Sequence, residues 1–260
     1  MKDWDVNIYR GVLTGFNDAF IISGEKRTEI LNNCINEDER KRTDELIRPI
    51  LRGRDIKRYE YYFADLYLIN THNGIKEKNI SRIDVNEYPA IKKHLDEYWD
   101  KISIRADKGD TPYNLRNCVY MDEFNKPYIA WLELTDEAKF TYCKNMVSLN
   151  TVFFLTGEKV FDLLGMLNSS LILFYFRNCL GTTSGVGTNR WLKYTVEQLP
   201  LFYNTPEELS KLVIELISLK TNGQDYSNTD MEIDNLVCSL YGLTKEEIDF
   251  VKQYKSKLLT

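Results

Sequence analysis

The chain has 260 residues, 43% hydrophobic and 28% charged, which is typical of a soluble globular protein with one large domain or two small ones. It carries 34 Lys and Arg against 39 Asp and Glu, so its overall charge permits a polyanionic partner without demanding one. Five scattered cysteines without a C-x-x-C pair argue against a disulfide framework and a zinc site, and they fit a reducing cytoplasm. The longest apolar run, at 171–176, is too short to span a bilayer, so we expect a cytoplasmic protein without a membrane partner.

The first predicted element is a hairpin. Residues 6–22 run apolar around two glycines, a pattern typical of two short strands joined by a tight turn at Thr14–Asn17. Apolar spacing further predicts helices at 25–35, 85–102 and 160–180, and strands at 64–69, 126–134, 139–143 and 151–157. Polar loops are predicted at 105–117 and 181–189, where turn-forming residues are concentrated.

The last part of the chain has a purely helical pattern. Helices are predicted at 205–220, 231–242 and 243–254. The first opens with Thr205 as N-cap and Pro206 at the first helical position, and the third carries a capping box at Thr244–Glu247. We therefore divide the chain into a body, residues 1–203, and a helical tail, residues 204–260, that packs on the body or on a partner domain.

The expected fold class is mixed α/β (α+β). The body is expected to contain a twisted mixed or antiparallel sheet with packed helices, followed by the C-terminal helical segment. The charged residues of the tail, Lys211 and Lys220 among them, are expected to form a solvated helix face. Eight aromatic residues are expected in the core: Tyr61, Tyr62, Phe63, Phe153, Phe154, Phe174, Tyr175 and Phe176.

No catalytic constellation is present in the sequence. His72 and His94 are far apart, and the acids around residue 90 have the spacing of a solvated helix face rather than of a metal site. The Gly/Thr segment at 181–187 lacks the Gly-Lys-Ser/Thr ending of a phosphate loop, and no Asn-Pro-Pro-Tyr stretch of adenine methylases occurs. An autonomous nuclease or methylase is therefore disfavoured.

Six stretches in consistent order share a resemblance to one family. They are IYRGVLTGFNDAFII, IRPILRGRDIKRY, KPYIAWLEL, GMLNSSLILFYF, VEQLPLF and EIDNLVCSLYGLTKEEI. Together they resemble the C-terminal target-recognition domain (TaqI-like specificity domain) of type IIG restriction–modification enzymes and related adenine-specific DNA methyltransferases. In that family, a nuclease and an S-adenosylmethionine-dependent methylase precede this domain, which selects the duplex sequence.

The resemblance implies that this chain recognises double-stranded DNA and is not itself an enzyme, as a fragment or as a free-standing subunit. It implies no cofactor for this chain, because S-adenosylmethionine and Mg²⁺ belong to the missing catalytic domains. A methyltransferase or nuclease domain or subunit is the implied protein partner. The alternative is a protein-interaction module that docks to such a subunit through its acidic helical tail.

The basic stretch at 47–59 is the first candidate DNA contact. Lysines and arginines near a turn glycine can neutralise successive phosphates, and Gly53 would let the backbone approach DNA. We expect contacts from Arg52, Arg54, Lys57 and Arg58, with Arg52 or Arg54 suited to a bidentate guanine contact. The alternative is that Asp55 pairs with one of these bases and closes a turn, and a structural role is expected for Asp55 itself.

Three further loops supply candidate contacts, because polar loops between regular elements often carry function. The first is the predicted turn with Thr14, Gly15 and Asn17, for which a purely structural role is an equal alternative. The other candidates are Arg105, Lys108, Tyr113, Asn114 and Arg116 in the second loop, and Thr183, Ser184, Asn189 and Arg190 in the third. Trp191 is expected to be packed.

Overall fold

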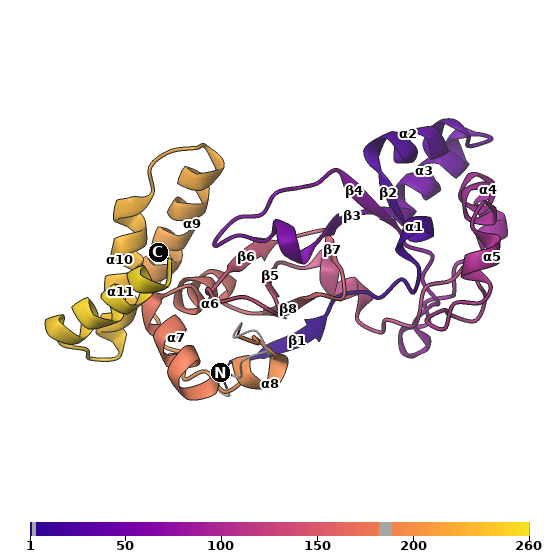
Figure 1. Cartoon of the computed structure of the whole chain (residues 1–260). Helices are drawn as coiled ribbons and strands as arrows, with labels where there is room; N and C mark the ends of the chain where they lie inside the picture. Colours follow the sequence, from indigo (N-terminus) through magenta and orange to yellow (C-terminus); the bar gives the residue numbers. More distant parts are fainter. Residues whose placement is uncertain (2–3, 182–188, 260) are drawn as a thin grey trace.

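In the computed structural model, which describes residues 1, 4–181 and 189–259, the chain folds into an elongated molecule (Figure 1). A lobe of short helices and a small sheet, the N-terminal lobe, lies at one end. A larger sheet occupies the centre, and the C-terminal helices lie at the other end. The mixed α/β fold predicted from the sequence is confirmed.

The central sheet is antiparallel. Its strands lie in the order β1 (Val6–Arg10), β8 (Val152–Gly157), β5 (Tyr128–Leu132) and β6 (Phe140–Cys143). Successive side chains of a strand face opposite sides of a sheet. In β5, Tyr128 and Ala130 join one hydrophobic core, whereas Ile129 and Trp131 join another. The sheet therefore separates two cores, and the strands predicted between residues 126 and 157 are confirmed.

A smaller sheet belongs to the N-terminal lobe. Its order is β2 (Ile21–Ser23), β4 (Leu66–Ile69), β3 (Ile47–Leu51) and β7 (Val147–Ser148), with only β3 and β7 parallel among the described pairs. The hairpin predicted for residues 6–22 is wrong. β1 pairs with β8, β2 pairs with β4, and helix α1 (Asn17–Phe20) lies between them. Both partner strands are distant in sequence, so local spacing gives no sign of the pairing.

The helices of the N-terminal lobe are α2 (Gly24–Asn32), α3 (Glu37–Leu46), α4 (Pro89–Asp96) and α5 (Trp99–Ile102). The helix predicted at 85–102 is thus two helices, and Asn86 lies in a preceding 3-10 turn instead of capping α4. Helix α3 was not predicted, because its sequence is almost entirely charged. It buries only Glu39, Thr43 and Leu46, and the Glu39 carboxylate accepts hydrogen bonds from the backbone of Ile35 and Ala90.

The apolar segment predicted as one helix at 160–180 is interrupted. It forms α6 (Val160–Leu167), α7 (Ser170–Tyr175) and a π-helical turn. At the break, Ser169 has an extended backbone and caps α7, and the Asn168 side chain bonds both the N–H and the C=O of Phe140, at 3.0 and 2.9 Å. Among the described residues, no single helix is long and apolar enough to cross a membrane. The segments Val160–Leu167 and Ser170–Leu180 reach that length and apolar composition only when taken together, and they are bent by 57° at the break between them.

The C-terminal helices pack against the body. Helix α9 (Glu207–Thr221) is followed by α10 (Ser227–Leu240) and α11 (Lys245–Leu259). Gly165 of α6 permits the close approach of α9, because a Cβ atom there would lie only 2.8 Å from Val213 Cγ2. The N-cap of α9 is Pro206 instead of the predicted Thr205, whereas the capping box of α11 is confirmed at Thr244–Glu247. The core that contains Ile129 and Trp131, which we call the second core, also contains Leu209, Val213 and Leu216 of α9. It therefore includes residues of both the body and the tail, which were divided at residue 203.

Candidate nucleic-acid interface

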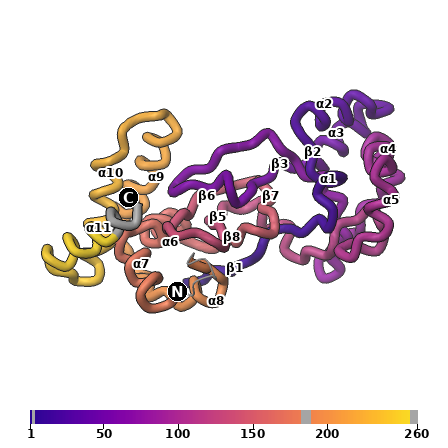
Figure 2. Tube along the Cα trace, in the orientation of Figure 1, coloured from indigo at the N-terminus to yellow at the C-terminus, as the bar shows by residue number. Residues whose placement is uncertain are grey.

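The basic stretch belongs to a long excursion of the chain, residues 52–65, which we call the strap. It leaves β3, runs beside the central sheet toward α9, and returns to β4 (Figure 2). Its two legs are joined by backbone hydrogen bonds from Tyr62 to Asp55 and from Lys57 to Glu60. The four bases Arg52, Arg54, Lys57 and Arg58 therefore lie along an extended path and not in one patch.

At the root of the strap, Arg52 is paired. Its guanidinium donates two hydrogen bonds to the Asp55 carboxylate, at 2.6 and 2.8 Å, which raises the pKa of Arg52. The structural role expected for Asp55 is thus confirmed. Gly53 does not bring backbone to the surface, contrary to expectation, because it is buried and a Cβ atom there would overlap the Leu132 side chain. The pair uses two of the five N–H donors of Arg52 and holds its side chain against Asp55.

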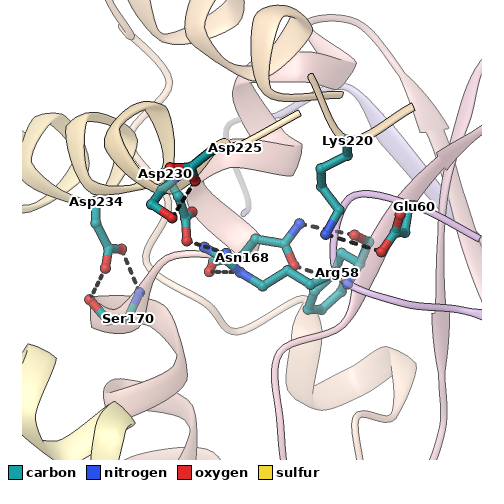
Figure 3. Close-up of polar contacts among 10 residues, drawn as sticks. Arg58, Glu60, Asn168, Ser170, Lys220, Asp225, Asp230 and Asp234 are labelled. Atoms are coloured by element: carbon teal, nitrogen blue, oxygen red, sulfur yellow. Dashed lines mark hydrogen bonds and ion pairs between the residues drawn. The ribbon is translucent and has the colours of Figure 1, made fainter. Parts of the chain in front are cut away.

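At the tip of the strap, Arg58 is turned inward (Figure 3). Its Nη1 donates to Asp230 at 2.6 Å, its Nε donates to the Asn168 carbonyl at 3.1 Å, and its side chain is only 19% exposed. Burial disfavours the charged guanidinium, but Tyr59 and Asp230 outweigh this and raise the pKa of Arg58. In this conformation Arg58 serves the fold and is not available to DNA.

Arg54 and Lys57 lie between these two paired arginines. The Arg54 side chain is exposed and Lys57 is half-buried. Neither has an ion pair or a side-chain hydrogen bond within the described part of the chain. Both remain predicted DNA contacts. The neighbouring Tyr62 and Phe63, predicted as core, are instead 60% and 45% exposed.

The loop at 105–117 is held by Arg105. This side chain is 6% exposed and donates to the backbone carbonyls of Thr14, Pro112 and Asn114. Desolvation lowers the pKa of Arg105 to about 10. Since its donors point at backbone acceptors, Arg105 is a structural residue in this conformation, and it joins the loop to the turn at Thr14.

The Thr14 turn is likewise structural at its centre. Thr14 is buried and donates its hydroxyl hydrogen bond to Asn17 Oδ1 at 2.6 Å, whereas Asn17 itself is exposed. Gly15 adopts a φ of 73°, which favours glycine, and it lies against the backbone of Asp107. Two loops predicted separately from the sequence are therefore brought together.

The remaining predicted contacts of this loop differ in accessibility. Lys108 is exposed and donates to the Ser103 carbonyl at 2.6 Å, and the Tyr113 hydroxyl donates to Asp96 at 2.5 Å. Asn114 is buried and bonds backbone carbonyls. Arg116 is 63% exposed and lies 3.2 Å from one Asp107 carboxylate oxygen. Lys108 and Arg116 are therefore the two exposed cations of this group.

Arg10, at the end of β1, was not singled out from the sequence. It is 55% exposed, its Nε donates to the Asn150 carbonyl at 2.7 Å, and its Nη2 lies 3.1 Å from Glu133. Arg190, which was predicted, lies 4.0 Å from the other oxygen of Glu133. The sequence signal for an exposed Arg10 was its position next to Gly11, at the end of a predicted strand.

Arg10 and Arg116 line the same concave site. Its volume is about 340 Å³, and it is lined by Arg10, Gly11, Val12, Leu13, Arg116, Asn117, Cys118, Tyr120 and Asn150. The Tyr120 hydroxyl donates to the Arg10 carbonyl at 2.9 Å and so ties the loop to β1. We call Arg10, Arg116 and Arg190 the arginine surface. Exposed ion pairs contribute only ~0–1 kcal/mol, so these guanidinium groups can exchange a carboxylate for a phosphate at little cost.

The third predicted loop falls largely outside the described residues, including Thr183 and Ser184. Asn189 is buried, and its backbone N–H donates to Asp136 at 3.3 Å. Trp191 is fully buried and stacks on Phe176 with ring centroids 3.6 Å apart, as expected for a packed residue. Where the structure describes the chain, no group of three or more His, Cys, Asp or Glu side chains could hold a metal ion.

Comparison with known proteins gives a consistent result. Residues 48–201 match the family described as the TaqI-like C-terminal specificity domain. The chain is similar in structure to the type IIL restriction-modification enzyme MmeI, solved in complex with DNA, with a TM-score of 0.66 and 14% identity over 97% of this chain and 35% of that chain. It is also similar to the type IIG restriction endonuclease BpuSI, with a TM-score of 0.50 and 13% identity over 90% of this chain and 30% of that chain. No curated protein matches the sequence.

The chain spans about a third of the length of these two enzymes. Their low identity supports the fold alone, whereas the family match includes the strap, strands β5, β6 and β8 of the central sheet, and Arg190. That match extends over more than half of the residues. The chain therefore belongs to the family of TaqI-like C-terminal specificity domains.

Proposed function

We propose that this chain is a sequence-specific recognition module for double-stranded DNA in a type IIG-like restriction–modification enzyme or an adenine-specific DNA methyltransferase. The family supports a recognition role, and MmeI, the similar enzyme, was solved in complex with DNA. The observation that carries the proposal is the arginine surface, where exposed guanidinium groups from distant parts of the chain line or border one concave site. Exposed guanidinium groups are suited to contacts with the phosphates of a DNA backbone.

In this proposal the chain contributes recognition and a separate domain or subunit contributes chemistry. S-adenosylmethionine and Mg²⁺ would be bound there, in the cytoplasm, and this chain would need no cofactor of its own. The alternative is docking to a partner subunit through the acidic helical tail, whose first helix, α9, carries an apolar stripe. Leu209, Val213 and Leu216 of that stripe are fully buried in the second core, so they are not available to a partner.

The test is binding to duplex DNA selected from a randomised pool, titrated at several salt concentrations. We expect the logarithm of affinity to fall steeply and linearly with the logarithm of salt concentration. The double variant Arg10→Gln/Arg116→Gln should lose affinity and reduce this slope by about two, one for each phosphate contact. Enrichment of one short sequence in the pool would support specific recognition.

Lys211→Gln is the matched control, because Lys211 is an exposed cation on α9 with an exposed partner, Glu207. Its binding should equal that of the unmodified protein. Binding that is absent at low salt, or that is insensitive to salt, would overturn the proposal. Equal losses in the control and in the double variant would remove the arginine surface as the site.

A further inference from the structure

The strap is too slender to hold its own shape. Apart from the 3-10 turn at Gly53–Asp55, its legs are joined only by the Ile56–Tyr61 bridge and the hydrogen bonds on either side of it. An isolated two-stranded ribbon is marginally stable in water. The conformation of the strap must therefore depend on what its tip contacts.

The tip is anchored by three consecutive residues. Arg58 bonds Asp230 of α10 and the Asn168 carbonyl, and Glu60 lies 3.1 Å from Lys220 of α9. Between them, Tyr59 is buried, and its backbone N–H donates to the Phe140 carbonyl of β6 at 2.9 Å. Tyr59 has a φ of 66°, an unfavourable value for a non-glycine residue that persists only where surrounding contacts impose it.

The anchors themselves are firmly placed (Figure 3). The Lys220 side chain is 9% exposed, and its ammonium lies 4.2 Å from the centre of the Tyr226 ring. One turn after Asp230, the Asp234 carboxylate accepts hydrogen bonds from the backbone N–H and the hydroxyl of Ser170, at 2.7 and 2.6 Å. Helix α10 thus binds the strap through Asp230 and the start of α7 through Asp234.

The legs of the strap present the groups that the tip does not use. Arg54 and Lys57 are unpaired on the leg that leaves β3, and Tyr62 and Phe63 are exposed on the returning leg. Cations beside exposed aromatic rings are suited to phosphates and to unstacked or splayed bases. At its root, Gly53 packs against Leu132 and Thr151, beside Glu133 and Asn150, which contact Arg10. The strap thus extends the arginine surface toward the C-terminal helices.

We propose that α9 and α10 set the DNA-binding conformation of the strap through Arg58 and Glu60, which act as positioning residues for Arg54 and Lys57. This inference rests on the proposed DNA recognition. It makes the C-terminal helices necessary for full affinity, although they supply no DNA contact themselves. It also explains why the acids of the tail face a basic segment far away in sequence.

The test uses two variants of the full chain. Glu60→Gln removes the carboxylate that pairs with Lys220, and Glu60→Gln/Asp230→Asn also removes the carboxylate that pairs with Arg58. Amide exchange at Lys57 and Tyr62 reports the strap, and duplex binding at several salt concentrations reports function. We expect faster exchange, about tenfold weaker binding for the double variant and a salt slope reduced by about two. Arg54→Gln/Lys57→Gln should give the same binding loss with unchanged exchange.

Lys211→Gln again serves as the control on α9. Faster strap exchange with unchanged affinity would overturn the positioning role while leaving DNA recognition intact. Loss of salt-dependent binding in the unmodified protein would instead overturn the proposed function. Should the double variant unfold, the single Glu60→Gln variant carries the test, since Glu60 is partly exposed and its loss leaves the Arg58 contacts in place.

Discussion

The strap and the arginine surface are both basic, but they differ in how their charge is arranged. The strap holds four cations within residues 52–58, yet Arg52 and Arg58 are bound to Asp55 and Asp230. The arginine surface is assembled from isolated residues, and Arg10 and Arg116 are more than half exposed. Cation density along a sequence therefore does not measure cation density on the surface, because a packed segment needs counter-charges and the fold supplies them.

The acidic tail likewise shows that charged residues are not always exposed. Its charged residues were predicted to form a solvated helix face, which is wrong for Lys220, Asp230 and Asp234. Each of these makes a close contact with the strap or with Ser170. Lys211 does lie on the solvated face. Asp230 of the acidic tail is thus the counter-charge of Arg58, a base of the strap about 170 residues earlier in the sequence.

The largest expected effect comes from exchanging a buried cation for a small side chain. Arg105→Ala should lower the free energy of unfolding by about 3 kcal/mol, because three backbone carbonyls lose their donors in a buried site. Arg116→Ala, in the same loop but exposed, should change stability by less than about 0.5 kcal/mol and should weaken DNA binding instead. Urea unfolding and duplex binding measure the two quantities. Equal stability losses would erase the distinction between the buried and exposed arginines.

Much of the fold follows from local sequence. Strands β5, β6 and β8 of the central sheet were predicted because they are rich in aromatic and β-branched residues, and α9 because its apolar stripe has helical spacing. The pairing of β1 with β8 could not be predicted, since it joins residues about 145 apart. The break after α6 was missed although Asn168, Ser169 and Ser170 interrupt the apolar pattern, and Ser169 caps α7 by accepting a hydrogen bond from the Ile172 N–H.

Less of the site was predictable. The loops at Thr14 and 105–117 were selected as polar segments, and the structure brings them together beside one concave site. What the sequence could not show is the partner of each charge, because Arg58–Asp230 and Arg10–Glu133 are pairs between distant residues. The local signal for Arg10 was limited to its position next to Gly11 at the end of a predicted strand, and its exposure and its pairing with Glu133 depend on the fold.

A titration tests whether the interior tolerates a cation without a counter-charge. His94 is buried in the N-terminal lobe, its Nε2 lies 3.0 Å from the Ala19 carbonyl, and its Nδ1 has no partner among the described residues. Desolvation lowers the pKa of His94 from its usual 6.5, so below that pH the unfolded chain binds more protons than the folded one. Stability should be retained above about pH 6.5 and should fall by up to about 1 kcal/mol by about pH 5.5.

The comparison that isolates this group is His94→Gln, whose amide can still donate to the Ala19 carbonyl. The variant should show a shallower fall in unfolding free energy between about pH 7 and about pH 5.5, measured by urea titration at each pH. The remaining slope would include His72, whose pKa is also lowered by desolvation. An unchanged slope in the variant would mean that His94 is protonated equally in both states.

The smallest effect expected concerns the carboxylate shared by the arginine surface. Glu133 lies near both Arg10 and Arg190, so it competes with phosphate for two guanidinium groups. Glu133→Gln should therefore strengthen binding to a duplex of arbitrary sequence by a few-fold and steepen its salt dependence, with little change in stability because both arginine partners are exposed and the amide can still accept a hydrogen bond from Arg10. Binding to arbitrary and selected duplexes at matched salt measures this. A loss of affinity confined to the selected sequence would mean that Glu133 orients the arginines or contacts a base itself, and that the arginine surface discriminates sequence as well as attracting phosphate.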